Sequence, residues 1–155
     1  STLFPYTTLF RSAALFSGTP LLLHPSDDIL YDMWDKFAVN ISRNLPQAVA
    51  SVGAGAYDDS PYLRDVEEKL RAEVCAVARA KGVHIPEKNK AGAYEKSSRY
   101  STLQDLDAGR HTEIDMFCGT LSRLGRELGV PTPYSECIYD FIKVLEEKND
   151  GKFDY

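Results

Sequence analysis

Three polar side chains near the start of the chain are spaced so that they could share one ligand. Lys36, Asn40 and Asn44 follow one another at intervals of four residues, which on a helix places them along one face. Two asparagines in line are unusual on a plain solvated face, because asparagine competes for backbone hydrogen bonds and is a poor helix former. Amides beside one cation suit a small, oxygen-rich anion. The solvated edge of an amphipathic helix is the alternative interpretation.

A second polar group lies between positions 101 and 113, with the sequence STLQDLDAGRHTE. Its last two residues, Thr112 and Glu113, stand where a helix is expected to begin. A hydroxyl and a carboxylate at that place satisfy unpaired amides and favour the helix dipole. Capping therefore accounts for part of this group, and neither group specifies an activity by itself.

Helices are the elements expected to carry both groups. Over residues 27–51, apolar side chains recur every four residues, which predicts a long helix with Ser26 as its N-cap. Pro46 is expected to kink or divide this helix, because proline lacks the amide hydrogen. The apolar residues of this stripe are Ile29, Met33, Phe37 and Ile41.

The same periodicity predicts three more helices, over 60–82, 113–129 and 132–150, while 51–59 and 86–98 read as loops. No convincing strand pattern occurs, so the predicted fold class is an all-α helical bundle. The residues expected to face the core are Leu63, Val66, Leu70, Val74 and Val77, then Ile114, Phe117, Leu121, Leu124 and Leu128, and finally Ile138, Phe141 and Leu145.

Composition argues against several classes of function. The chain has 23 acidic and 18 basic residues and no basic stripe, which argues against a nucleic-acid partner. No apolar run reaches the roughly 20 residues that cross a bilayer, so no membrane partner is expected. Three cysteines without paired spacing suit a reducing, cytoplasmic location. The three histidines are too scattered to predict a metal site.

The first twelve residues look foreign to the rest of the chain. Thr2 to Ser12, TLFPYTTLFRS, is similar to the read-through translation of a common DNA sequencing adapter. We therefore expect residues 1–12 to be non-native and the gene-derived sequence to begin near Ala13. A natural terminal segment is the alternative. A secretory signal is not expected, because Pro5 and Arg11 interrupt the apolar stretch.

Three blocks of sequence resemble ketopantoate reductases. The first two are W-x-K-x-x-x-N-x-x-x-N, at 34–44, and S-x-L-Q-D-x-x-x-x-R-x-T-E-I-D, at 101–115. The third is GTLSRLGRELGVPTP, at 119–133, and all three keep the order and separation of that family. The resemblance is to the helical C-terminal domain, whose fold is similar to that of 6-phosphogluconate dehydrogenase-like proteins. It implies that residues 13–155 form this substrate-binding domain.

The resemblance implies an NADPH-dependent oxidoreductase that reduces 2-dehydropantoate, a small 2-keto acid, to pantoate for pantothenate and coenzyme A synthesis. Lys36 matches the general acid of the family, and Glu113 matches a residue that contacts the cofactor. Trp34 is expected to pack the helix. The residues that match substrate-binding positions are Lys36, Asn40, Asn44, Ser101, Thr102, Leu103 and Gln104.

Two departures from the family pattern limit this expectation. Ala54 stands where many members carry a further substrate-binding asparagine, which leaves another branched 2-keto acid open as the substrate. The glycine-rich turn G-x-G-x-x-G of the nucleotide-binding domain is also missing, so we expect this chain alone neither to hold NADPH tightly nor to turn over.

The amphipathic stripes alone would equally support a non-catalytic helical module that serves only association or folding. The two hypotheses differ in geometry, because the reductase predicts that Lys36 and Glu113 face one cleft and the module predicts separate faces. An apolar surface toward a missing domain would also make self-association, for example as a homodimer, unsurprising.

Overall fold

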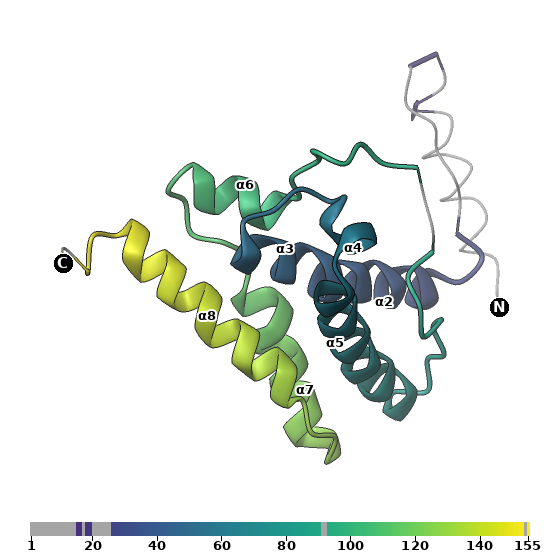
Figure 1. The fold of residues 1–155 in the computed structure, drawn as a ribbon. Helices are drawn as coiled ribbons and strands as arrows, with labels where there is room; N and C mark the ends of the chain where they lie inside the picture. The colour runs from purple at the N-terminus through teal and green to yellow at the C-terminus, as the bar shows by residue number, and fades with distance from the viewer. Residues whose placement is uncertain (1–14, 17, 20–25, 91–92, 154) are drawn as a thin grey trace, which may run out of the picture.

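The computed structural model shows a chain built from helices (Figure 1). No strand occurs in the residues that the structure describes, and the predicted all-α fold is confirmed. No helix in that part of the chain is both long enough and apolar enough to span a bilayer. The expected non-native segment, 1–12, lies outside the described residues. The described residues are 15–16, 18–19, 26–90, 93–153 and 155.

The first long helix, α2 (Ile29–Val39), begins two residues later than the start predicted from the sequence. The carboxylate of Asp28 accepts a hydrogen bond from the amide of Tyr31 at 3.0 Å and so caps the helix. Ser26, the predicted cap, instead accepts from the amide of Asp28 at 3.2 Å. The prediction of a helix here is confirmed, and the choice of cap was wrong.

Pro46 does not divide this helix. The chain continues from α2 through a π-helical turn, η1 (Asn40–Asn44), into α3 (Leu45–Ala50). A π turn immediately before a proline is physically reasonable, because the proline has no amide hydrogen and its ring crowds the carbonyl four residues earlier. The polar line of the sequence therefore lies on one continuous helical segment.

The predicted loop 51–59 contains a short helix, α4 (Ala56–Asp59). Its Tyr57 is buried, and its hydroxyl donates to the main-chain carbonyl of Arg43 at 2.5 Å. Burial raises the pKa of this phenol far above its ordinary value. The prediction of a flexible loop was therefore wrong for its second half, because one aromatic side chain anchors it to the core.

The first half of this loop pairs with residues 96–98, which precede the helix α6 (Ser101–Asp107). The amide of Ala54 donates to the carbonyl of Ser98 at 2.9 Å, and the amide of Gly55 donates to that of Lys96 at 2.9 Å. A Cβ atom at Gly53 would lie 2.4 Å from the carbonyl oxygen of Lys96. Glycine is required there because two main-chain segments approach each other closely.

The other predicted helices are confirmed. Ser60 caps the second, its hydroxyl accepting from the amide of Leu63 at 3.3 Å. Gly82 and Gly129 follow helix ends in the left-handed conformation, with φ of 80° and 69°. The confirmed helices are α5 (Pro61–Ala80), the π-helical turn η2 (Asp115–Gly119) with α7 (Thr120–Leu128), and α8 (Pro133–Asn149). The helix α6 (Ser101–Asp107) was not among the helices predicted from apolar periodicity.

A buried carboxylate fixes the start of α8. Glu73 of α5, 7% exposed, accepts hydrogen bonds from the amides of Tyr134 and Ser135 at 2.8 Å each and from the hydroxyl of Ser135 at 2.6 Å. Thr132, the predicted opening residue, makes no capping bond with its side chain. The anion for this helix N-terminus thus comes from a distant helix.

The core lies where α3, α5, α7 and α8 pack together, and in Figure 1 α8 runs along the side of the bundle next to α7. Several residues predicted to face the core are instead exposed, because periodicity identifies a common face but not how far neighbouring helices cover it. These residues are Ile29 and Met33, each 61% exposed, Val66, 37% exposed, and Phe141, 55% exposed.

Candidate functional site

The polar line predicted from the sequence becomes more buried along its length. Lys36 is exposed, and its side chain makes no hydrogen bond or ion pair within the described part of the chain. Asn40 is half-buried, and Asn44 is only 7% exposed. The side-chain Nδ2 of Asn44 donates to Oδ1 of Asn40 at 3.3 Å. A solvated helix edge does not account for Asn44, because a buried amide needs partners.

The same amide links the polar line to the second group. Nδ2 of Asn44 lies 3.5 Å from Oγ of Ser101, the first residue of α6, so residues 57 positions apart meet here. The side chains of Thr102 and Leu103, which follow Ser101, are buried, each with 2% exposure. The exposed side chain of Gln104 donates to the carbonyl of Arg99 at 2.6 Å.

Gln47 holds the entry to α6 and was not singled out from the sequence. It lies one turn after Asn44 and is fully buried. Its Nε2 donates to the carbonyl of Ser98 at 2.9 Å, and its Oε1 accepts from the amide of Tyr100 at 2.7 Å. One side chain thus satisfies two main-chain groups directly before Ser101. A glutamine within the otherwise apolar stretch LPQAVA was the available signal.

Glu113, the predicted cofactor contact, lies in the turn before η2. It is exposed, and its side chain has no partner in the described part of the chain. The residue before it is held firmly, because Oε1 of Glu146 accepts from both the amide and the hydroxyl of Thr112 at 2.7 Å each. The hydroxyl of Thr112 also accepts from the amide of Ile114 at 3.3 Å, so it satisfies one amide just before η2, but the N-cap of η2 is Ile114, which makes no capping bond with its side chain.

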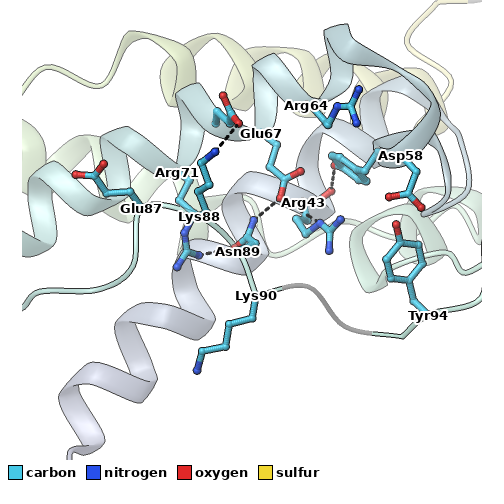
Figure 2. Close-up of a pocket in the computed structure, with 12 residues that line it drawn as sticks. Arg43, Asp58, Arg64, Glu67, Arg71, Glu87, Lys88, Asn89, Lys90 and Tyr94 are labelled. Atoms are coloured by element: carbon cyan, nitrogen blue, oxygen red, sulfur yellow. Dashed lines mark hydrogen bonds and ion pairs between the residues drawn. The ribbon is translucent and has the colours of Figure 1, made fainter.

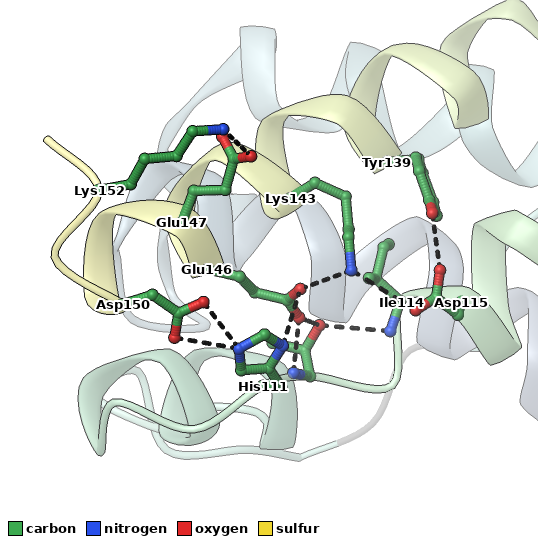
Figure 3. Close-up of polar contacts among 10 residues, drawn as sticks. His111, Ile114, Asp115, Tyr139, Lys143, Glu146, Glu147, Asp150 and Lys152 are labelled. Atoms are coloured by element: carbon green, nitrogen blue, oxygen red, sulfur yellow. Dashed lines mark hydrogen bonds and ion pairs between the residues drawn. The ribbon is translucent and has the colours of Figure 1, made fainter.

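Glu146 is the centre of the polar network in Figure 3. It is 2% exposed, and Nζ of Lys143 donates to its second oxygen at 2.9 Å. Burial alone would raise the pKa of Glu146, but the hydrogen bonds from Lys143 and Thr112 outweigh burial and hold the pKa below its ordinary value. His111 adds a weaker contact, with Nδ1 3.6 Å from the carboxylate. The carboxylate is therefore held charged beneath the turn that carries Glu113.

Aromatic side chains connect the two parts of the site. Phe37, next to Lys36, packs against Phe117 of η2 with ring centroids 6.4 Å apart. Trp34 packs edge-on against Phe37 at 5.7 Å, in agreement with its predicted packing role. Because Phe117 lies one turn after Glu113, the segments that carry Lys36 and Glu113 are neighbours. That their side chains face one cleft stays a prediction.

A separate charged pocket of about 350 Å³ lies between α5 and the segment that follows it (Figure 2). Its central residue is Arg71, 1% exposed, which is paired with Asp35 at 2.5 Å and donates to the carbonyl of Pro86 at 2.8 Å. Asn89 accepts from Arg71 and donates to the hydroxyl of Ser42 at 2.9 Å. These paired groups fasten the 86–90 segment to the bundle, and none of the predicted site residues lines the pocket.

Metal-binding side chains do not gather in the part of the chain that the structure describes. There, no group of three or more His, Cys, Asp or Glu residues is arranged to hold an ion. The three cysteines are free, with Cys75 and Cys118 buried and Cys137 exposed. Burial raises the pKa of the thiols of Cys75 and Cys118, which disfavours their reactive thiolate form.

Comparison with known proteins gives a consistent result. Residues 28–146 match the family model described as "Ketopantoate reductase PanE/ApbA C terminal". The 2-dehydropantoate 2-reductase of Pyrobaculum aerophilum is 32% identical over 125 residues, which are 77% of this chain and 45% of that protein. The corresponding protein of Caulobacter vibrioides is 33% identical over 127 residues, 78% of this chain and 43% of that protein. The chain spans less than half the length of these curated relatives.

Solved structures share the fold. A PanE/ApbA family ketopantoate reductase from Ralstonia eutropha JMP134 superposes with a TM-score of 0.78 at 25% identity, over 91% of this chain and 49% of that one. A D-mandelate dehydrogenase, solved with NADH and anilino(oxo)acetate, gives a TM-score of 0.84 at 24% identity, over 93% and 63% of the two chains. With the match of the family model over most of its length, this chain belongs to the ketopantoate reductase family and carries its C-terminal domain.

Proposed function

We propose that this chain is the substrate-binding domain of an NADPH-dependent 2-dehydropantoate 2-reductase. The observation that carries the proposal is the link between Asn40, Asn44 and Ser101, which come from two separate elements and meet through one buried amide. An exposed ammonium, that of Lys36, lies one helical turn before Asn40. Relatives named 2-dehydropantoate 2-reductase support the same reaction.

The polar residues suit a 2-keto acid that carries a carboxylate, a carbonyl and a hydroxyl group. Among the described residues, Nδ2 of Asn40 and Oδ1 of Asn44 have no protein partner, so one donor and one acceptor remain for a ligand. Ser101 offers a hydroxyl beside them. Thr102 and Leu103 are buried, so they would contact substrate only through their main chain.

Lys36 is the residue to which we assign general-acid catalysis. As the substrate carbon C2 is reduced, the carbonyl oxygen gains negative charge. An ammonium beside that oxygen stabilises the charge and then donates the proton that completes the alcohol. Such assistance typically contributes about 10²–10⁴ in rate. The absence of an ion pair to Lys36 within the described part of the chain leaves its ammonium available for this role.

Glu113 fits the cofactor contact that we propose. Its carboxylate is exposed and without a partner in the described residues, and carboxylate oxygens accept hydrogen bonds from the ribose hydroxyls or the carboxamide of a nicotinamide dinucleotide. When bound, NADPH supplies the hydride. The contribution of this chain would be to hold the dinucleotide with Glu113 and the 2-keto acid with Asn40 and Asn44.

The test is to join this chain to the remaining portion of the Caulobacter vibrioides relative, since the chain aligns with only part of that protein. The joined enzyme is expected to oxidise NADPH, followed by its absorbance, only when 2-dehydropantoate is added. Lys36→Ala should remove most of this activity, and Lys148→Ala, which changes an exposed lysine of α8, should not. The proposal would be contradicted if the unsubstituted joined enzyme oxidised no NADPH in response to a 2-keto acid. It would also be contradicted if Lys36→Ala and Lys148→Ala changed the activity equally.

Ala54 favours a second candidate substrate, another branched 2-keto acid. Its side chain is fully buried and its amide is bonded to Ser98, so this loop position contributes no polar side chain to a ligand. A panel of 2-keto acids assayed with the joined enzyme distinguishes the two substrates. A kcat/KM for another acid that exceeds that for 2-dehydropantoate would replace the substrate and leave the reaction type unchanged.

We also propose that the protein forms a homodimer. A ketopantoate reductase from Staphylococcus aureus with the same fold is described as dimeric, and its TM-score to this chain is 0.76. Exposed apolar residues on α3, α5 and α8 support association, because large apolar surfaces are rarely left open to water. Light scattering coupled to size-exclusion chromatography tests the dimer, and a monomer mass at all concentrations would contradict it.

A further inference from the structure

We propose that Gln47 and Glu146 are positioning residues that set the affinities for two different ligands. Each holds the main chain directly before a residue of the proposed site, Gln47 before Ser101 and Glu146 before Glu113. Gln47 therefore governs binding of the 2-keto acid, and Glu146 governs binding of the dinucleotide. This inference rests on the proposed function and adds two residues to it.

The position of Gln47 leaves little freedom to the start of α6. Its amide group bonds in both directions, from Nε2 to the carbonyl of Ser98 and from the amide of Tyr100 to Oε1. The side chain of Gln47 is fully buried and its partners Ser98 and Tyr100 are partly buried, so water does not reach the amide group of Gln47 without a rearrangement. Because Gln47 and Asn44 lie one turn apart on the same helical segment, this clamp also fixes how far Ser101 stands from Asn44.

Glu146 does the same for the turn that carries Glu113. One carboxylate oxygen accepts two hydrogen bonds from Thr112, and the other accepts from Lys143, so the carboxylate cannot rotate without losing at least one of them. Figure 3 shows Lys143 and His111 directed at Glu146 from either side. Glu113 itself is exposed, so the main chain that Glu146 holds is what determines where its carboxylate points.

The two clamps are independent in the described structure. The side chain of Gln47, on α3, bonds only to the segment before α6. The side chain of Glu146, on α8, bonds only to the turn before η2 and to Lys143 of its own helix. Loss of either would loosen one half of the site. A general loss of stability would instead weaken both ligands together.

The test measures KM for each ligand in the joined enzyme. Gln47→Met keeps the side-chain length and removes both hydrogen bonds, so KM for the 2-keto acid is expected to rise about tenfold while KM for NADPH changes less than about twofold. Glu146→Met is expected to give the reverse pattern. Glu146→Gln keeps an oxygen acceptor for Thr112 and is expected to restore much of the affinity for NADPH.

Two further measurements distinguish a local loosening of the main chain from a nonspecific effect of substitution. Hydrogen exchange on this chain by itself should show faster exchange of the Tyr100 amide in Gln47→Met and of the Thr112 amide in Glu146→Met. Asn149→Ala removes a side-chain bond to the carbonyl of Leu106, at the far end of α6, and is the matched control expected to change neither KM.

If a methionine variant fails to fold, milder substitutions answer the same question. Gln47→Asn keeps the amide group but shortens the side chain by one methylene, which weakens its bonds to Ser98 and Tyr100. Thr112→Val removes the hydroxyl bonds to Glu146 and from the amide of Ile114, and keeps the main-chain bond to Glu146. Each is expected to show a smaller effect on the same ligand as the full substitution. If the unsubstituted joined enzyme is active but a substitution changes both KM values equally, or changes neither, the positioning roles of Gln47 and Glu146 are wrong and the proposed function stands. A parent that reduces no 2-keto acid would overturn the proposed function and this inference with it.

Discussion

Replacing Glu73 tests whether a distant carboxylate holds α8 in place. Glu73→Ala removes three hydrogen bonds, those from the amides of Tyr134 and Ser135 and from the hydroxyl of Ser135. Ser135 is fully buried, so its two donors would be left without a partner, at about 1–3 kcal/mol each. Tyr134 is half-exposed and its amide can turn to water. We therefore expect the free energy of unfolding to fall by about 3–5 kcal/mol.

Urea denaturation followed by circular dichroism measures this loss. For a chain of this size, the expected change corresponds to a fall in Tm of roughly 6–20 °C. Glu136→Ala is the matched control, because Glu136 belongs to the same helix but pairs with Arg126 on the surface, and exposed pairs contribute about 0–1 kcal/mol. A loss below about 1 kcal/mol for Glu73→Ala, or one no larger than the control, would refute the reasoning.

Two other substitutions test local features. Gly53→Ala is expected to lower the free energy of unfolding by about 1–3 kcal/mol, because its Cβ would lie 2.4 Å from the carbonyl oxygen of Lys96. Gly119→Ala is its control in the same denaturation assay, since the nearest atom there is 3.6 Å away, and an equal loss in both would contradict the close approach. Tyr139→Phe is expected to raise the pKa of Asp115, because it removes the 2.6 Å hydrogen bond that lowers it; an NMR titration measures this, and an unchanged pKa would count against the bond. A lowered folded pKa stabilises the protein above the unfolded pKa, so the stability difference between parent and Tyr139→Phe should shrink as pH falls through the folded pKa of Asp115.

The helices were the most predictable part of this fold. Apolar periodicity located α5 and α7, and glycines marked their ends, because these signals are local. The exposure of Phe141 was not predictable, since it depends on which neighbouring helices reach that part of α8. The π turn before Pro46 was also not predictable from the sequence. Sequence rules predict that proline disturbs a helix, but not how the helix adjusts to it.

The candidate site was predictable only for residues that match a family motif. Asn44 and Ser101 were both expected from the motifs, and the structure brings them together. Gln47 bonds to main-chain groups about 50 residues away, so its role follows from the tertiary fold. Glu146 is 2% exposed although it begins the charged sequence EEKND, and nothing local distinguishes it from Glu147 beside it.

The general-acid role of Lys36 is the central claim, and chemical rescue tests it most directly. In the joined enzyme, Lys36→Ala is expected to lower kcat by about 10²–10⁴. Adding methylammonium, which replaces the lost ammonium in the space left by the side chain, should restore part of that kcat in proportion to its concentration. A kcat within about threefold of the parent, or a large loss that no amine restores, would contradict the assignment of the proton donor to Lys36.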